Sequence, residues 1–364
     1  MARVLFVHNP EYLRRILSLL TGRFSSRITY EIVTYTVTGR VGPNRLTSEG
    51  IRLWLLGDPR LRSVIATFEP DIVFSDSALY GTHLKILSLL GRKRVPLIIH
   101  LRGDPWREFW ARFLVTRPPL QLLMPQEYVY NWTSLFLARK IAPACKWLGR
   151  VVRTHIPGKK IEVLYPPVDI TQYYEQDGLE FQRPAVAIIQ NHNIYLKVLG
   201  LMNLRKVVQR LPDVHFYISE GESVEQQFLP MVKNHYRGLK NVHFVTGIDN
   251  PAGIRMMLTA SDCYVLATGL DCCPVTVLEA SLMRRPVIAS RVGGVPEIVP
   301  ENETGWTIGN GDIENWIEKI RLVATDTKLN RRLGQNGRDF VSKHFGSEVI
   351  APQMERLILN EVIG

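Results

Sequence analysis

Short apolar runs alternate along the chain with segments in which apolar residues recur at helical spacing. In the first half, the runs that predict strands lie at residues 3–8, 29–35, 72–74 and 95–101. Helical spacing appears between them, at residues 10–20 and 84–90. Wholly apolar strands are typical of a parallel sheet that is covered on both faces, so this half predicts an α/β domain.

The second half repeats the alternation. Strands are predicted at residues 185–190, 214–219, 242–246, 262–266 and 287–290. Helices are predicted at residues 199–210, 250–261, 275–283 and 346–362. Two successive βα alternations predict two doubly wound, Rossmann-like domains, which we assign to residues 1–170 and 171–346. The join lies in residues 161–178, where Tyr165-Pro-Pro-Val-Asp169 precedes a polar run.

The two halves of the chain also differ in net charge. The chain carries a formal charge of +11, and residues 1–180 hold 25 lysines and arginines against 15 acidic residues. Residues 181–364 hold 20 basic and 19 acidic residues. A basic half attracts lipid head groups, phosphorylated substrates or nucleic acid, and it is also compatible with a solvated surface without a specific partner. The sequence has no helix-turn-helix, zinc-finger or RNP-like motif, so we expect no nucleic-acid partner.

Composition and cysteine spacing exclude several classes of protein. With 46% hydrophobic and 22% charged residues, the chain is typical of folded proteins. No run approaches the ~18 apolar residues of a membrane-spanning helix, and the apolar start before His8 is too short for a signal peptide. The cysteines lack the spacing of zinc ligands or of a disulfide framework; they are Cys145, Cys263, Cys272 and Cys273. We therefore expect a cytoplasmic protein, either free or peripheral at the cytoplasmic membrane face.

The most informative stretch is residues 261–307. A predicted strand ends in a loop that contains Asp271, a helix begins near Pro274, and Glu279 follows about a turn later. Backbone amides at a helix N-terminus bind phosphate, and ligands of doubly wound sheets bind at the carboxyl ends of the strands. The stretch therefore predicts a site for the phosphates of a nucleotide.

The same stretch resembles the donor-site signature of GT-B-fold retaining glycosyltransferases of glycosyltransferase family 4. The matching elements are Asp271, Glu279, Pro286-Val-Ile-Ala-Ser290, Val292-Gly-Gly-Val-Pro-Glu297 and Thr304-Gly305. The resemblance extends over residues 160–364, whereas residues 1–160 match only in general architecture. It implies the GT-B fold, an α/β fold with two doubly wound domains facing a cleft, in which helix 347–364 returns to the first domain.

The resemblance also implies an activity. It predicts a retaining glycosyltransferase, of the hexosyltransferase type, that moves a sugar from a nucleotide-sugar donor to an acceptor hydroxyl. The chain contains no DxD motif, so we expect no metal and no other cofactor. The alternative is a catalytically silent GT-B protein that binds a nucleotide-sugar or a partner enzyme.

Candidate donor-site residues follow from the family pattern. Lys197 is expected to bind the diphosphate, Glu279 the ribose hydroxyls and Asp271, where the family usually has glutamate, the sugar hydroxyls. The backbone of Ile248 is expected to contact the base. The remaining donor-side candidates are the turn residues Cys272, Cys273, Pro274 and Val275, and Asn191 and His192, where the family usually has an arginine. Each of the three charged residues also has a structural alternative: a solvated lysine, an exposed helix glutamate and a loop aspartate without a ligand.

The segment His100-Leu-Arg-Gly-Asp104 follows a buried strand in the first half. We expect His100 and Arg102 to act at the catalytic centre and Asp104 on the acceptor side, because strand ends of such sheets face the ligand. Arg102 is a candidate replacement for the missing family arginine. In the alternative, Arg102 and Asp104 pair with each other within the loop.

Residues 106–117 combine aromatic and basic side chains at helical spacing. Trp106, Arg107, Trp110 and Arg112 are our candidates for an acceptor or membrane surface. Arginine and tryptophan on one amphipathic helix are typical of binding to anionic lipid, which indicates a lipid-linked acceptor. The alternative is that these aromatic residues pack in the core.

Overall fold

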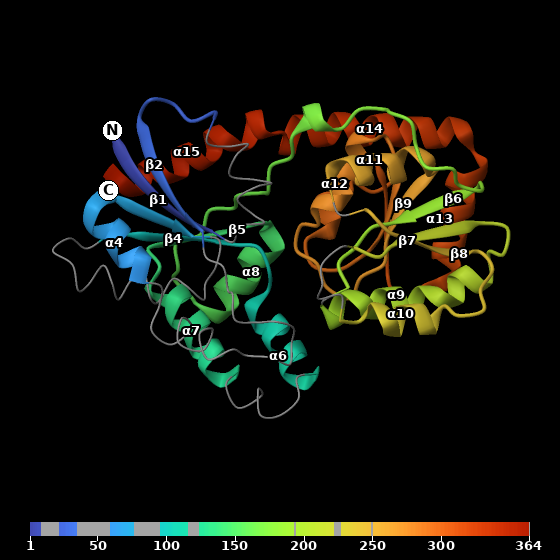
Figure 1. Cartoon of the computed structure of the whole chain (residues 1–364), viewed down its shortest axis with the longest axis horizontal. Coiled ribbons are helices and arrows are strands. Elements are labelled where there is room, and N and C mark those ends of the chain that lie inside the picture. Colours follow the sequence, from blue (N-terminus) through green and yellow to red (C-terminus); the bar gives the residue numbers. More distant parts are fainter. Residues whose placement is uncertain are drawn as a thin grey trace. The chain divides into compact units, whose positions relative to one another are not determined.

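The computed structural model describes residues 1–8, 22–34, 59–75, 95–115, 124–192, 194–221, 227–248 and 250–363. The chain folds into two compact units: Met1–Pro167 with Ser347–Gly364 form unit 1, and Val168–Gly346 form unit 2. Each unit contains a parallel sheet with its own helices (Figure 1). The helices predicted at residues 10–20 and 84–90 lie outside the described residues.

Unit 1 is built on a parallel sheet with the strand order β2-β1-β3-β4-β5. Its strands are β1 (Ala2–His8), β2 (Ile28–Thr34), β3 (Ile72–Ser75), β4 (Leu97–Leu101) and β5 (Lys140–Pro143). Its helices are α4 (Pro59–Phe68), α6 (Pro105–Val115), α7 (Met124–Leu137), α8 (Lys146–His155) and α15 (Ser347–Ile363). Every residue of β3 and β4 is buried, as a sheet covered on both faces requires.

Helix α15, which ends the chain, packs in unit 1. Its residues Ile350, Met354 and Leu357 are fully buried and share one apolar cluster with Phe6 of β1 and Phe74 of β3. Acidic side chains of the helix also pair with basic residues of unit 1, among them Glu361 with Lys140 of β5. The helix therefore covers the sheet of unit 1, although it follows unit 2 in the sequence (Figure 1).

Unit 2 has a second parallel sheet, with the strand order β11-β10-β9-β6-β7-β8. Its strands are β6 (Ala185–Ile188), β7 (His215–Ser219), β8 (Val242–Val245), β9 (Cys263–Leu266), β10 (Val287–Ser290) and β11 (Gly305–Ile308). Its helices are α9 (Tyr195–Gln209), α10 (Leu229–His235), α11 (Pro251–Ala260), α12 (Val275–Leu282), α13 (Ile313–Thr325) and α14 (Thr327–Phe345), together with the 3-10 turns η3 (Ile170–Gln172) and η4 (Val295–Glu297).

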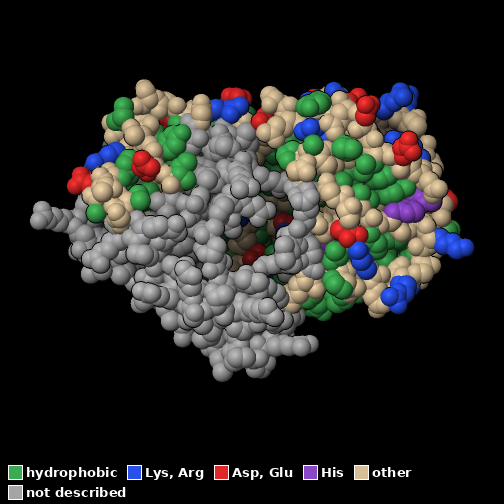
Figure 2. Space-filling view, in the orientation of Figure 1, with side chains coloured by type: hydrophobic (Ala, Val, Ile, Leu, Met, Phe, Trp, Pro, Cys, Tyr) green, Lys and Arg blue, Asp and Glu red, His purple; other side chains and the backbone are tan. Residues whose placement is uncertain are grey.

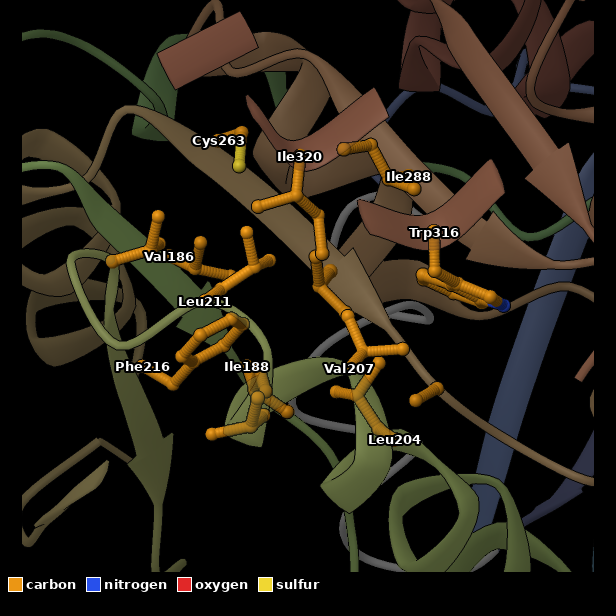
Figure 3. Packing of buried hydrophobic residues seen from close by; sticks show 14 of the residues in the cluster. Val186, Ile188, Leu204, Val207, Leu211, Phe216, Cys263, Ile288, Trp316 and Ile320 are labelled. Atoms are coloured by element: carbon orange, nitrogen blue, oxygen red, sulfur yellow. The ribbon is translucent and has the colours of Figure 1, made fainter. Parts of the chain in front are cut away.

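The core of unit 2 joins the sheet to helices α9 and α13. Figure 3 shows Val186 of β6 and Phe216 of β7 on one side of this cluster, and Leu204 of α9 and Trp316 of α13 on the other; Ile188 of β6 belongs to the same cluster. All five side chains are less than 5% exposed. On the face of unit 2 that Figure 2 shows, acidic and basic side chains are interspersed, in contrast to the apolar core.

The structure confirms the predicted fold class, with two doubly wound α/β units. Two strands were missed: β5 begins with Lys140, and β11 contains Gly305 and Thr307, so neither is a simple apolar run. Helix α9 begins at Tyr195, earlier than the predicted start at Leu199. Lys197 therefore lies within the first turn of the helix and not before it.

Candidate active site

The strand order of unit 2 reverses between β6 and β9. These neighbours pair in parallel, and the chain continues from β6 to β7 on one side and from β9 to β10 on the other. In open α/β sheets, ligands bind outside the carboxyl ends of the strands at such a switch point. The segments that follow β6 and β9 hold Lys197 and Asp271.

Two glycines bring helix α9 against the loop that follows β9. A side chain at Gly200 would lie 2.2 Å from the backbone nitrogen of Thr268, and one at Gly269 would lie 2.4 Å from the carbonyl oxygen of Leu196. The backbone amide of Gly269 donates a hydrogen bond of 2.9 Å to that same oxygen. Only glycine permits this close approach, which fixes the loop beside the first turn of α9.

Lys197 and Asp271 meet at this junction. The ammonium Nζ of Lys197 lies 2.9 Å from Oδ2 of Asp271, and the two side chains are 25% and 10% exposed. Oδ1 of Asp271 accepts a hydrogen bond from the backbone amide of Cys272. The sequence predicted both residues at the site but assigned them to different parts of the donor, and their ion pair was not foreseen.

Glu279 lies in α12 with only 2% of its surface exposed. The hydroxyl of Tyr173 donates a hydrogen bond of 2.5 Å to Oε1 of the carboxylate. Tyr173 is itself held through its carbonyl oxygen, which accepts a hydrogen bond from Arg338. The alternative of an exposed helix glutamate is therefore wrong. No sequence pattern pointed to Tyr173, which follows the join between the units.

The N-terminus of α12 lies next to these residues in the sequence. Pro274 is the N-cap residue, so Val275 and not Pro274 is the first helical residue, and no side chain caps this end. Cys272 and Pro274 are buried, whereas Cys273 and Val275 are partly exposed. An uncapped helix start presents amide dipoles that favour a negatively charged ligand.

Tyr264 of β9 is fully buried. Its hydroxyl is 2.8 Å from both the carbonyl oxygen of Ile189, after β6, and Oγ1 of Thr276, in the first turn of α12. Burial raises the pKa of this phenol, and the charges of Glu279 and Asp271 raise it further. Tyr264 therefore stays protonated and connects the two sides of the switch point.

His192 does not supply the cation that the family's arginine would provide. The ring is fully buried, and its Nε2 donates a hydrogen bond of 2.8 Å to the carbonyl oxygen of Ser219. Burial lowers the pKa of His192, although this hydrogen bond and the charge of Glu220 act in the opposite direction. The imidazole is therefore neutral at neutral pH. Asn191, at the other arginine position, is exposed.

Ile248 is buried and follows β8, which lies two strands from β6 in the sheet order. The loop around it is tight, because a side chain at Gly253 would lie 2.2 Å from the carbonyl oxygen of Gly247. Asn250 then caps α11 by accepting a hydrogen bond from the amide of Gly253. The backbone of Ile248 is thereby fixed at the carboxyl end of the sheet, where the resemblance expects the base.

The candidates in unit 1 have structural partners of their own. His100 is 1% exposed, and its Nε2 donates to the carbonyl oxygen of Leu164 at 3.0 Å. Arg102 is exposed directly after β4. Asp104 is buried at the start of α6, where Oδ1 accepts from the amides of Trp106 and Arg107. The Arg107 guanidinium also lies 3.5 Å from Oδ2, so Asp104 caps and pairs within the helix.

Helix α6 has both a core face and an exposed residue. Trp106 is 5% exposed and stacks on the ring of His155 at 4.0 Å, and Phe109 is also buried. The expectation that Trp106 lies on a membrane surface is therefore wrong, because its ring packs inside unit 1. Trp110 is 55% exposed. The side chain of Arg112 lies outside the described residues.

Two absences hold for the residues that the structure describes. Within these ranges, no group of three or more His, Cys, Asp and Glu side chains is arranged to hold a metal ion. None of the helices described is both long and apolar enough to cross a membrane. All four cysteines are free thiols.

Part of the chain is similar to a known protein family. Residues 184–340 match the family described as Glycosyl transferases group 1. N-acetyl-alpha-D-glucosaminyl L-malate synthase of Bacillus anthracis is 25% identical over 209 residues, which make up 55% of this chain and 54% of that protein. The chain spans about half the length of the curated relatives that it matches first.

Solved structures match over almost the whole chain. Sucrose-phosphate synthase from Thermosynechococcus elongatus aligns with a TM-score of 0.76 at 16% identity and covers 99% of both chains. The Anabaena protein Alr3699/HepE, solved in complex with UDP-glucose, aligns with a TM-score of 0.71 at 16% identity, over 99% of this chain and 100% of that one. At this identity the likeness establishes the fold. Residues 184–340 are thus similar to the glycosyl transferases group 1, in a chain that has the GT-B fold.

Proposed function

We propose that the chain is a retaining, metal-independent glycosyltransferase that moves a sugar from a nucleotide-sugar to an acceptor hydroxyl. The observation that carries this proposal is the meeting of Lys197 and Asp271 at the switch point of the group 1 domain, followed by Glu279 in the adjoining helix α12. The cation suits the diphosphate of the donor, and the two carboxylates suit the hydroxyls of its sugar and of its ribose.

Each residue has a role that follows from its chemistry. The leaving group of the transfer is a nucleoside diphosphate, and an enzyme accelerates the reaction by stabilising the charge that develops there. Lys197 and the amides at the start of α12 supply this stabilisation. The buried carboxylate of Glu279 accepts hydrogen bonds from the ribose hydroxyls, and Asp271 accepts them from the sugar.

Metal independence and retention rest on separate grounds. The sequence lacks a DxD motif, and Lys197 is the cation that we assign to the diphosphate. Retention rests on the donor-site motif that ends in Thr304-Gly305. An assay with added EDTA tests the first point. The anomeric configuration of the product, read from its proton coupling constants, tests the second.

The nucleotide is the part of the donor that can be tested first. Because a protein of the same fold was solved with UDP-glucose, UDP-sugars are the first donors to test, followed by GDP- and ADP-sugars. The experiment measures release of the nucleoside diphosphate from each donor in the presence of candidate acceptors. Turnover with one donor, abolished in Glu279→Ala, supports the proposal. Binding of a donor without turnover on any acceptor supports the second candidate below.

The second candidate function is a catalytically silent protein that binds a nucleotide-sugar or a partner enzyme. The neutral, buried ring of His192 favours it, because the site then lacks a cation at the position of the family's arginine. We propose that the exposed Arg102 of unit 1 replaces this arginine in the enzyme. If Arg102→Ala leaves turnover unchanged, that assignment fails while the donor site stands.

We propose a lipid-linked acceptor at an anionic membrane surface. Among the described side chains of helices α6 and α7, large apolar ones are exposed: Trp110 by 55%, Val129 by 59% and Phe136 by 65%. They belong to the strongly basic half of the sequence, and basic residues near an anionic surface each contribute about 1 kcal/mol of attraction. The free cysteines fit a protein at the cytoplasmic face. Co-sedimentation with phosphatidylglycerol vesicles, weakened by Trp110→Ala and by salt, tests this assignment.

A further inference from the structure

We infer that the ion pair between Lys197 and Asp271 is the resting state of the donor site, and that it makes the site discriminate against a nucleoside diphosphate without its sugar. The inference rests on the proposed function, because it assigns the diphosphate to Lys197 and the sugar to Asp271. It adds that these two side chains bind each other when the donor is absent, so a ligand must compete with their ion pair.

The pair is close and sheltered from water. The charged atoms are 2.9 Å apart, with the lysine side chain 25% and the aspartate side chain 10% exposed. By contrast, the pair between Arg284 and Glu175 has side chains that are 43% and 65% exposed. Because the dielectric constant falls with burial, the sheltered pair is the stronger one and ligand binding must compete with it.

Asp271 is the fixed partner. Its Oδ1 accepts a hydrogen bond from the amide of Cys272, and its carbonyl oxygen accepts one from the amide of Gly294. Gly293 has a φ of +54°, and a side chain there would lie 1.9 Å from that carbonyl oxygen. The loop is therefore constrained from two sides, whereas Lys197 extends on a flexible four-carbon side chain from the first turn of α9.

The competition has opposite consequences for the donor and for the product. A diphosphate attracts Lys197 away from Asp271 and leaves a sheltered carboxylate close to its own negative charge. In a nucleotide-sugar, the hydroxyls of the sugar donate hydrogen bonds to this carboxylate and compensate it. After transfer the sugar has left, so Asp271 repels the remaining nucleoside diphosphate and recaptures Lys197. The carboxylate thus favours binding of the intact donor and release of the product.

The test is the affinity for UDP and for UDP-glucose, measured by calorimetry on the full chain, with GDP, ADP and their glucose conjugates in parallel. The Asp271→Asn variant removes the charge but keeps the oxygen that accepts from Cys272. It is expected to bind the free nucleoside diphosphate about tenfold more tightly than the wild type, with a smaller gain at high salt. Its affinity for the nucleotide-sugar is expected to rise less, so the preference for the intact donor falls.

The control is Asp326→Asn, because the carboxylate of Asp326 also accepts a hydrogen bond from a backbone amide, that of Leu329, but it caps α14 and lies outside the site. Asparagine caps helices as well as aspartate does, so nucleotide binding is expected to be unchanged. Asp271→Ser removes the charge in a second way and is decisive if the asparagine variant does not fold. An unchanged or weaker affinity for the nucleoside diphosphate in the Asp271 variants overturns the inference. Failure of every nucleotide to bind any of the proteins overturns the proposed function instead.

Discussion

The hydroxyl of Tyr173 donates a 2.5 Å hydrogen bond to Glu279, a residue 106 positions later in the chain. Both side chains are buried, at 5% and 2% exposure. A hydrogen bond to a buried carboxylate fixes its rotamer and contributes about 1.5–3 kcal/mol. Tyr173 is therefore a positioning residue for the group that we assign to the ribose.

Replacement of Tyr173 by phenylalanine tests this positioning role. The variant keeps the ring and loses the hydroxyl, so KM for the donor is expected to rise about tenfold while kcat changes less. Steady-state kinetics with varied donor concentration measures the two constants. Tyr174→Phe is the matched control, because Tyr174 is 54% exposed and its ring lies beside Arg255. A donor KM that stays the same in Tyr173→Phe contradicts the assigned role.

Lys197 is expected to matter most for the chemical step. Loss of one group that stabilises charge in the transition state typically lowers kcat by about 100-fold or more, and we expect this from Lys197→Ala. Lys206→Ala on the same helix is the control, because Lys206 is exposed near the end of α9. If the two variants have similar kcat values, Lys197 does not stabilise charge in the transition state.

Unit 2 is expected to lose stability in acid. Burial and the neighbouring His215 lower the pKa of His243, and burial lowers that of His192. These rings take up protons more readily when unfolded, so stability falls as the pH drops below about 6.5. The Tm at pH 5.5 should therefore be lower than that at pH 7.5. His243→Asn should reduce this difference, because it leaves only His192 of the two; an equal or higher Tm at pH 5.5 would refute the prediction.

The attachment of α15 to unit 1 depends on Glu361. Its carboxylate is 7% exposed and lies 2.9 Å from both Arg139 and Lys140. Glu361→Gln leaves these cations without that charge and should lower the free energy of unfolding by about 3 kcal/mol. Glu348→Gln should cost less than about 1 kcal/mol, because Glu348 is 71% exposed in its pair with Arg23. Urea unfolding monitored by tryptophan fluorescence compares the two variants, and equal losses would show that burial does not decide their effect.

Sequence patterns predicted strands whose residues are mostly apolar. Strand β10 was predicted with its observed bounds, because three of its four residues are apolar. The start of α9 was missed, because Ile194 is its N-cap residue and forms no side-chain cap bond that a sequence pattern reveals. This helix start therefore has neither a capping box nor an N-terminal proline that would mark it in the sequence.

The candidate site residues were proposed from the sequence, but their contacts were not. Lys197, Asp271 and Glu279 were selected through the family resemblance of the segments in which they lie. Their partners depend on tertiary approach: the lysine meets the aspartate only because Gly200 and Gly269 bring their backbones together. No periodic pattern in the sequence reveals that these two side chains are in contact.

The measurement that tests the central claim most directly is calorimetric binding of UDP-, GDP- and ADP-sugars to the wild type and to Glu279→Ala. Glu318→Ala is the control, because Glu318 is 63% exposed on α13. We predict that one nucleotide-sugar binds the wild type and the control alike, and binds Glu279→Ala at least about tenfold more weakly. Binding that is equal in all three proteins, or absent from all three, would contradict a donor site at Glu279.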